Sequence, residues 1–417
     1  MLVFEAKLKG KPEQFKQIDK AIRTGQFVRN SCLRYWEDNR GVGKNDLQKY
    51  CAVLAKKSEF PWAAKLNSMA RQAHADRVWN AISRFFENCR NQVPGKKGYP
   101  RYKKHSRSVE YKTTGWKLSN DRKYLTLTDG FKAGKFKLLG TRDLTWYTKE
   151  QIKRVRIVKR ADGYYAQFCL NFERLEKAEF TGSQIGVDVG LNAFYTDSNG
   201  NKIDNRRYLR QSEKRLKRIQ RKMSRRYSNP GKGKKNQKMV KTRVKQSQRY
   251  HAARKSVARA HLRVSRQRKD HATKLARCVI QSNDLVAYEN LKVRNMVKNH
   301  CLAKSISDAG WSMFTDWLDY FAKIMGKVVV AVPPHYTSQN CSNCGATVKK
   351  SLSVRVHKCP ECGTSLDRDE NAALNILMKA LGALGVDTTT VGHTESNAQE
   401  ENDRCFVGES LHGKSAR

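Results

Sequence analysis

The sequence has few acidic side chains and no long apolar run. Its 417 residues contain 38 Asp and Glu against 84 Lys and Arg, a formal charge of +46. This excess is far beyond what solubility requires, and it predicts polyanionic partners. No stretch of about 18 apolar residues occurs, and the first residues lack the apolar segment of a signal peptide. We therefore expect a soluble, intracellular protein with no membrane partner.

Cysteines spaced for disulfides are also scarce. Seven of the eleven are scattered singly, which fits a reducing compartment: Cys32, Cys51, Cys89, Cys169, Cys278, Cys301 and Cys405. The other four form two Cys-x2-Cys pairs with 14 residues between them: Cys341, Cys344, Cys359 and Cys362. This spacing predicts a closed, structural zinc site, with reducible disulfides as the alternative. His335 and His357 are expected at the surface rather than as ligands.

Three acidic residues have local settings that suit a metal-dependent nuclease. Asp188 lies in a predicted strand whose apolar residues alternate with glycines, so one face is buried and the carboxylate leaves the other. Glu289 ends a buried strand, where open α/β sheets place their chemistry. Asp369 comes four residues before Ala373 on a helix with an apolar stripe. Three acids in such settings favour a metal site.

Carboxylates of this kind can hold two divalent ions about 4 Å apart, which activate a water and stabilise the leaving oxygen of a phosphodiester. The alternative for Asp369 is an acid that the helix dipole stabilises at the N-terminus of the helix. Asp367 could fill that role equally well.

The length of the chain suggests two or three domains, and the hydrophobic period predicts an α+β protein. A strand at 2–8 precedes helical spacing over about 12–92. From 109 to 173 the period changes to two, with a tight hairpin at Asp162–Gly163. Several short strands with turn signals favour a compact β-barrel.

A very basic segment follows, with 28 Lys and Arg and only two acids between Arg206 and Arg277. A thin apolar stripe predicts a helix from about 209 to 223, broken at 229–231 and resumed near Lys238. Disorder is the alternative. The regular stripe favours a pair of helices that binds phosphates through counterion release.

In this order the motifs resemble the TnpB family, insertion-sequence proteins related to compact type V CRISPR effectors. The matching segments are Gly186-Val-Asp188-Val-Gly190, Glu289-Asn-Leu291, Ser338-Gln-x-Cys341-x2-Cys344-Gly, Cys359-x-x-Cys362-Gly and Asp367-Arg-Asp369-x-Asn-Ala-Ala-x-Asn-Ile. Two further segments, Gly98-Tyr-Pro-Arg-Tyr-Lys-Lys104 and Ser305-Ile-Ser-Asp308-Ala-Gly-Trp311, resemble other family blocks. The resemblance runs from about residue 2 to residue 383.

The resemblance implies an RNA-guided DNA endonuclease of a transposable element, which cuts double-stranded target DNA beside a short adjacent motif. It implies a noncoding guide RNA made from the end of the element, two catalytic Mg²⁺ ions held by Asp188, Glu289 and Asp369, and structural Zn²⁺ on the four paired cysteines. Gln72 and Thr114 approximately match positions that contact the adjacent motif. The implied ribonucleoprotein contains one copy of the chain, in a prokaryotic cytoplasm or nucleoid.

The implied fold has two main parts. The first is an N-terminal wedge-like β-barrel of residues 1–11 and 109–182, with a helical recognition insert at 12–108. The second is a C-terminal RNase H-like (RuvC) α/β domain of residues 183–334 and 367–384, with basic helices at 205–280 and an inserted zinc ribbon at 335–366. Residues 385–417 lose periodicity, which predicts a disordered tail.

Two other functions stay open. One is a nuclease-silent RNA-guided DNA-binding repressor, which the presence of all three acids disfavours. The other is a strand-joining transposase, since RNase H-like transposases also use three carboxylates.

Overall fold

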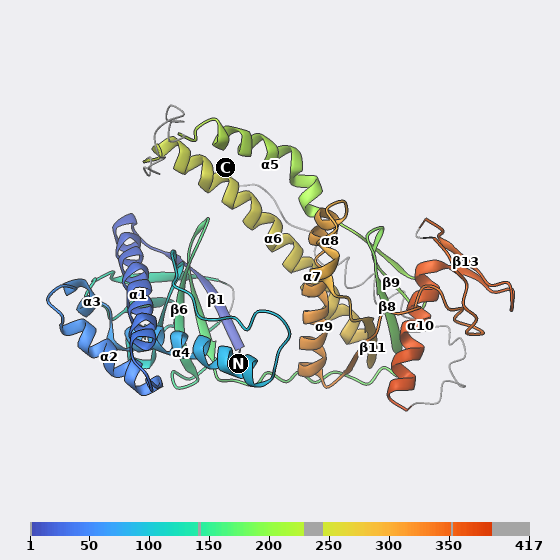
Figure 1. Cartoon of the computed structure of the whole chain (residues 1–417), viewed down its shortest axis with the longest axis horizontal. Coiled ribbons are helices and arrows are strands. Elements are labelled where there is room, and N and C mark those ends of the chain that lie inside the picture. Colours follow the sequence, from blue (N-terminus) through green and yellow to red (C-terminus); the bar gives the residue numbers. More distant parts are fainter. Residues whose placement is uncertain (1, 141–142, 229–244, 352, 386–417) are drawn as a thin grey trace. The chain divides into compact units, whose positions relative to one another are not determined.

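The computed structural model describes residues 2–140, 143–228, 245–351 and 353–385 (Figure 1). The chain divides into two compact units, Met1–Arg174 and Leu175–Arg417. No helix in the described ranges is long and apolar enough to span a bilayer. Of the predicted tail at 385–417, residues 386–417 lie outside the described residues, as does the predicted helix start near Lys238.

The first unit contains a curled, antiparallel sheet of seven strands in the order β2-β6-β7-β1-β5-β4-β3 (Figure 1). The strands are β1 Leu2–Lys9, β2 Ser108–Lys112, β3 Trp116–Leu118, β4 Tyr124–Leu127, β5 Lys135–Leu139, β6 Ile152–Arg160 and β7 Gly163–Leu170. The predicted hairpin between β6 and β7 is confirmed. The end strands β2 and β3 are joined by the short helix η1 (Thr113–Gly115). Closure of the sheet into a barrel stays a prediction.

Strand β1 lies between β5 and β7, although four helices separate it from the other strands in the sequence. These helices are α1 Pro12–Asp38, α2 Lys44–Lys56, α3 Pro61–Lys65 and α4 Ser68–Arg90. Pro12 suits the first turn of α1, because a proline there loses no intrahelical hydrogen bond. The apolar faces of the helices and the sheet form one core. The predicted helical region at 12–92 is thus confirmed, and it is inserted between strands of one sheet.

A buried carboxylate joins helix and sheet in this unit. Glu110 on β2 is 1% exposed and lies 3.0 Å from Arg77 of α4, 3.1 Å from Arg154 and 2.9 Å from Arg156 of β6. Burial raises the pKa of Glu110, but the charges and hydrogen bonds of Arg77 and Arg156 outweigh it and lower the pKa to about 2. The carboxylate therefore stays ionised and holds α4 against the sheet.

The second unit contains a mixed sheet of five strands in the order β10-β9-β8-β11-β12. The strands are β8 Gln184–Val189, β9 Ala193–Asp197, β10 Lys202–Asp204, β11 Leu285–Glu289 and β12 Val328–Val332. β8, β9 and β10 pair antiparallel, whereas β8, β11 and β12 pair parallel. The carboxyl ends of the three parallel strands therefore lie at one edge of the sheet.

Helices cover both faces of this second sheet. α6 (Gln248–Ser282) and α9 (Trp311–Met325) share a core with one face, whereas α10 (Arg368–Ala383) packs on the other (Figure 1). Shorter helices are α7 Val293–Met296 and α8 Ala303–Ala309. The alternation along β8 divides its side chains between the two faces, because Ile185 and Val187 join the core with α6 and α9, while Gly186 meets α10.

Gly186 allows α10 to approach the sheet closely. A Cβ atom at this position would lie 2.0 Å from the carbonyl oxygen of Ala373 and 2.9 Å from the amide nitrogen of Leu377. Both are helix backbone atoms, which a change of side-chain rotamer cannot move away. The glycine is therefore required by packing rather than by its backbone angles.

The basic segment forms α5 (Tyr208–Ser224) and α6, which pack against each other. Ser247 caps α6, since its side-chain oxygen accepts a hydrogen bond from the amide of Tyr250 at 3.1 Å. The prediction of two helices is confirmed for the described residues, and the alternative of disorder is wrong there.

We predict that Gly186→Ala destabilises the second unit by about 3 kcal/mol or more, because α10 must move away from β8. Urea denaturation followed by circular dichroism measures the effect. The matched control is Gly382→Ala on the same helix, where a Cβ meets no atom within 4 Å. This substitution should stabilise by up to about 1 kcal/mol, since alanine favours the helix. Equal midpoints for the two variants would contradict the packing argument.

We predict that Glu110→Gln destabilises the first unit by about 2 kcal/mol at pH 7, because three arginines lose their buried partner. The folded pKa of about 2 lies below the ordinary value of 4.5, so this stabilisation is present above pH 4.5 and disappears as the pH falls through 2. Urea midpoints at a series of pH values should therefore converge for the wild type and the variant in acid. Glu59→Gln, at an exposed position, is the control.

Candidate active site and metal centre

Two acids lie side by side at the carboxyl edge of the parallel strands. Val187 of β8 pairs with Tyr288 of β11 in parallel register. The next residues along the two strands, Asp188 and Glu289, therefore occupy corresponding positions on neighbouring strands.

Both carboxylates face α10. Asp188 lies two residues after Gly186, which meets the backbone of α10. Glu289 lies two residues after Ala287, which packs with Ile376 of α10. Because side chains on a strand alternate between faces, the two acids share the face of the sheet that α10 covers.

Asp369 reaches the same edge from α10. The helix runs antiparallel to the strands, since Leu285 at the start of β11 packs with Leu381 near the end of α10. The first turn of α10 therefore lies toward the carboxyl ends of the strands. Asp369 is in this turn, four residues before Ala373, the residue that meets Gly186.

Glu289 and Asp369 both affect the ionisation of Asp188. Burial raises the pKa of Asp188 well above its usual range, and the negative charges of Glu289 and Asp369 raise it further against the opposing charge of Arg368. Burial also raises the pKa of Glu289, against the hydrogen bond that Thr337 donates to it. Buried carboxylates that repel one another are stabilised by a cation, so this arrangement favours binding of divalent metal.

The acids are less tightly gathered than the four paired cysteines. Within the described ranges, those cysteines are the only set of three or more His, Cys, Asp or Glu residues whose ligand atoms all lie within 4.8 Å of one another. Asp369 also has a cationic neighbour, because Arg355 Nη1 lies 3.6 Å from its Oδ1.

Asp367 has a structural role. Its side chain caps α10, where it accepts hydrogen bonds from the amides of Asp369 at 2.9 Å and Glu370 at 3.4 Å, and it pairs with Lys202 at 2.6 Å. Burial raises its pKa, but these partners lower it below the usual value. Asp367 is thus the capping acid of α10, and Asp369 lies in the first turn that follows it.

Two asparagines that sequence reasoning missed hold the loop before the first cysteine pair against α10. Asn375 donates hydrogen bonds to the carbonyls of Thr337 and Asn340, both at 2.8 Å. Asn371 donates to Asn340 at 2.8 Å and accepts from the amide of Ser342 at 2.9 Å. The sequence signal for them was a pair of amide side chains one turn apart on an otherwise apolar helix face. Buried amides require hydrogen-bond partners.

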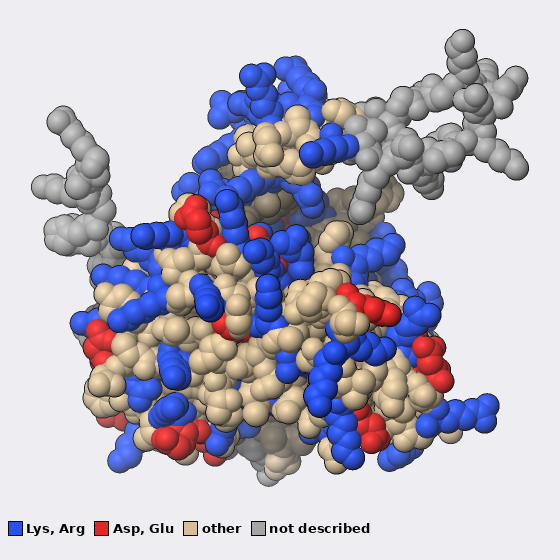
Figure 2. Space-filling view, turned by 90° about the vertical axis from the view of Figure 1, so that its left-hand side faces the viewer, with Lys and Arg blue, Asp and Glu red and all other residues tan. Residues whose placement is uncertain are grey.

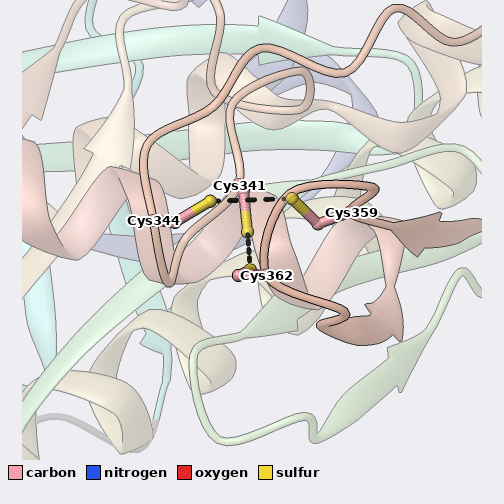
Figure 3. Close-up of side chains that lie close together, drawn as sticks. All are labelled: Cys341, Cys344, Cys359 and Cys362. Atoms are coloured by element: carbon pink, nitrogen blue, oxygen red, sulfur yellow. Dashed lines mark hydrogen bonds between the residues drawn. The ribbon is translucent and has the colours of Figure 1, made fainter.

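The four paired cysteines lie together around the hairpin of β13 (Val356–Lys358) and β14 (Ser365–Asp367), as Figure 3 shows. The Sγ atoms of Cys341 and Cys362 are 3.6 Å apart, as are those of Cys344 and Cys359. A disulfide needs about 2.05 Å. Four sulfurs each about 2.3 Å from one tetrahedral ion are separated by about 3.8 Å, so the arrangement fits a metal centre rather than disulfides.

The two histidines of this region differ in exposure. His335 is exposed, as predicted, whereas the prediction of a surface position is wrong for His357, which is fully buried. β13 directs His357 into the ribbon, where Lys350 contacts its Nδ1 atom.

The predicted nucleic-acid contacts lie in the first unit, on neighbouring elements. Gln72 is in the first turns of α4, and Thr114 is exposed in η1. Asn67, the cap of α4, donates to the hydroxyl of Thr128, which donates to the carbonyl of Thr114. The start of α4 and η1 are therefore tied together.

Two family models match different parts of the chain. A family model described as "Cas12f1-like, TNB domain" matches residues 311–376, and one described as "Probable transposase" matches residues 167–237 and 227–300. The structure titled "Cryo-EM structure of the Cas12f1-sgRNA-target DNA complex" is similar in fold, with a TM-score of 0.50 and 14% identity over 87% of this chain and 82% of that one.

Two relatives match most of the chain. The protein named "Putative RNA-guided DNA endonuclease" of Streptomyces pristinaespiralis is 30% identical over 385 residues, which are 89% of this chain and 87% of the relative. "Putative RNA-guided DNA endonuclease InsQ" of Escherichia coli (strain K12) is 24% identical over 374 residues, or 84% of this chain and 85% of the relative. Identity of this extent over nearly the whole length shows that the chain belongs to the TnpB family of RNA-guided DNA endonucleases.

Proposed function

We propose that this protein cuts double-stranded DNA chosen by a guide RNA, and that Asp188, Glu289 and Asp369 perform the chemistry. The observation that carries the proposal is the parallel register of β8 and β11, which aligns Asp188 with Glu289 under the first turn of α10. Three acids from segments distant in sequence converge in this way at the edge where open α/β sheets bind ligands.

The donor set fits magnesium, which prefers oxygen ligands. Two magnesium ions held by Asp188, Glu289 and Asp369 would supply an activated water and a positive charge for the leaving oxygen of the phosphodiester. The surrounding residues orient these acids. Thr337 donates a hydrogen bond to Glu289, and Arg355 neighbours Asp369.

We assign residues 183–334 and 367–384 to an RNase H-like (RuvC) domain. An antiparallel hairpin that continues into parallel strands, with helices on both faces, supports this assignment. Residues 335–366 form its zinc ribbon. Residues 1–11 and 109–182 form the wedge-like barrel around the helical insert at 12–108, and residues 175–182 of this segment group with the second unit.

The guide RNA and the target DNA are the partners that the charge favours. Lys and Arg outnumber acids over the face of the molecule in Figure 2. α5 has nine Lys, Arg or amide side chains around a single buried leucine, Leu216, and it presents its cations to solvent. Base pairing would choose the target, while the protein binds phosphates and reads the adjacent motif near Gln72 and Thr114. One copy of the chain suffices for the proposed complex.

We predict that Asp188→Ala lowers the rate of plasmid cleavage by on the order of 10³-fold, about 4 kcal/mol of barrier, because the site that would hold the metal loses one of its carboxylates. RNA and target affinity should stay within about threefold of the wild type, a difference of about 0.7 kcal/mol. The matched control is Asp367→Asn, which weakens the cap of α10 but should retain cleavage.

The products separate this function from the alternatives. The purified complex, incubated with Mg²⁺ and a plasmid that carries the target, should give cut ends that need the guide. A stable complex without cut ends would indicate the repressor, and strand-joined products would indicate the transposase. Equal loss of binding and cleavage in Asp188→Ala would contradict the proposed role of this residue.

We also propose that Cys341, Cys344, Cys359 and Cys362 hold a structural zinc ion. Four sulfur ligands leave no open position, so the ion would stabilise the ribbon rather than react with DNA. Asn371 and Asn375 attach this ribbon to α10, the helix that carries Asp369. Unfolding of the ribbon would therefore disturb the position of Asp369 relative to the other two acids.

We predict that Cys359→Ser lowers the zinc content of the purified protein from one ion to about zero per chain and lowers the melting temperature, because metal binding and folding of such ribbons are coupled. Elemental analysis and thermal denaturation measure the two effects. Cys301→Ser, at an exposed cysteine outside the ribbon, should keep one zinc ion. Full zinc occupancy in Cys359→Ser would contradict the assignment.

A further inference from the structure

A basic hollow of about 360 Å³ opens in the first unit between α1, α3 and the turn that follows β4. Its wall includes Lys20, Arg23, Trp62, Lys65, Gly130 and Phe131. The volume is near the lower end of the roughly 300–1,000 Å³ typical of small-ligand sites. It therefore suits one nucleotide-sized group rather than a helix or a duplex.

The wall of the hollow is fixed by backbone contacts. The amide of Gly130 donates a hydrogen bond to the carbonyl of Lys65 at 2.8 Å, which ties the turn to α3. A Cβ atom at Gly130 would lie 3.2 Å from the Cα and carbonyl oxygen of Lys65, so glycine permits this close approach. On the opposite wall, Lys20 and Arg23 are three residues apart on one face of α1.

Trp62 offers an aromatic surface beside this hollow. Trp62 is 42% exposed, which is high for so large an apolar residue. The edges of Phe27 and Phe60 support it, with ring centroids 5.9 and 5.6 Å away and planes inclined at 62° and 68°. Two edge contacts restrain the indole and leave part of it available for stacking.

The cations of the hollow have no acidic partner. Lys20, Arg23 and Lys65 form no ion pair within the part of the chain that the structure describes. The acids next to the wall in sequence have other partners. Asp19 pairs with Lys159 at 2.6 Å, and Asp129 accepts hydrogen bonds from Tyr111 and from the amide of Asn67. The hollow thus keeps three uncompensated positive charges beside an exposed ring.

We propose that this hollow binds one unpaired nucleotide of an RNA or DNA strand, with the base stacked on Trp62 and the phosphate held by Lys20, Arg23 and Lys65. An unpaired nucleotide combines an aromatic face with a negative charge, and proteins bind single strands through such pairs of contacts. The inference rests on the proposed function only in requiring that the protein binds nucleic acid.

Ultraviolet cross-linking of the full-length protein with its copurified RNA, alone and with target DNA, tests the site directly. Trypsin releases Ser58–Lys65, a peptide that contains Trp62. We expect a nucleotide adduct on this peptide in mass spectrometry, and the ribose or deoxyribose mass identifies the strand. Adducts on other peptides with none on Ser58–Lys65 would overturn the proposal.

Variants test the energetics of the same contact. Trp62→Ala should weaken binding of the strand that cross-links by about tenfold, whereas Trp62→Phe should retain most of the affinity. The double variant Arg23→Ala with Lys65→Ala should reduce the salt dependence of binding. Trp146→Ala is the control, since Trp146 is 83% exposed and lies outside the hollow. Melting temperatures confirm that each variant is folded.

The outcomes distinguish this inference from the proposed function. If the wild type binds its guide RNA and cuts DNA while Trp62→Ala binds both strands equally well, the hollow has no role as a nucleotide site. If the wild type itself neither retains RNA nor cuts, the proposed function fails. A Trp62 cross-link to RNA or DNA in that case would still support the site.

Discussion

The contact between Gly186 of β8 and the backbone of α10 determines how the second unit is built. It allows a helix to lie against the strand without an intervening side chain. α10 begins immediately after the ribbon and runs antiparallel to the strands. The contact at Gly186 therefore also sets the distance between the first turn of the helix and the sheet. The position of Asp369 relative to Asp188 follows from this packing rather than from any bond between the two residues.

Buried carboxylates in this basic chain occur in two opposite electrostatic settings. Glu110 is surrounded by arginines, so its pKa is low and it serves as a fixed structural charge. Asp188 is buried beside two other acids, so burial first and their negative charges second raise its pKa, and its charged form needs an external cation. The composition alone does not distinguish the two residues, because the difference comes from neighbours that are distant in sequence.

Patterns within single segments of the sequence predicted strands, helices and motifs that depend on neighbouring residues alone. The alternation in β8 and the apolar stripe of α10 each depend on residues within one segment, and both predictions are confirmed. The spacing of the cysteines predicted a zinc site, and the structure brings the four sulfurs together. The burial of His357, the hydrogen bonds of Asn371 and Asn375, and the hollow beside Trp62 depend on two or three segments meeting. Helical spacing placed Asp369 at the start of the apolar stripe, and the observed cap at Asp367 gives the neighbouring acid a separate structural role.

The place of β1 between β5 and β7 has a consequence for synthesis on the ribosome. The first strand of the chain leaves the exit tunnel early, but the partner on each side of it is completed only at Leu139 and Leu170. Until then, the backbone groups at the edges of β1 have no strand partner. During this interval α1 to α4, which depend on shorter-range contacts, can fold beside it. A nascent chain that stalls before β7 would expose an edge of β1 together with Phe4 and Leu8, which the finished fold buries.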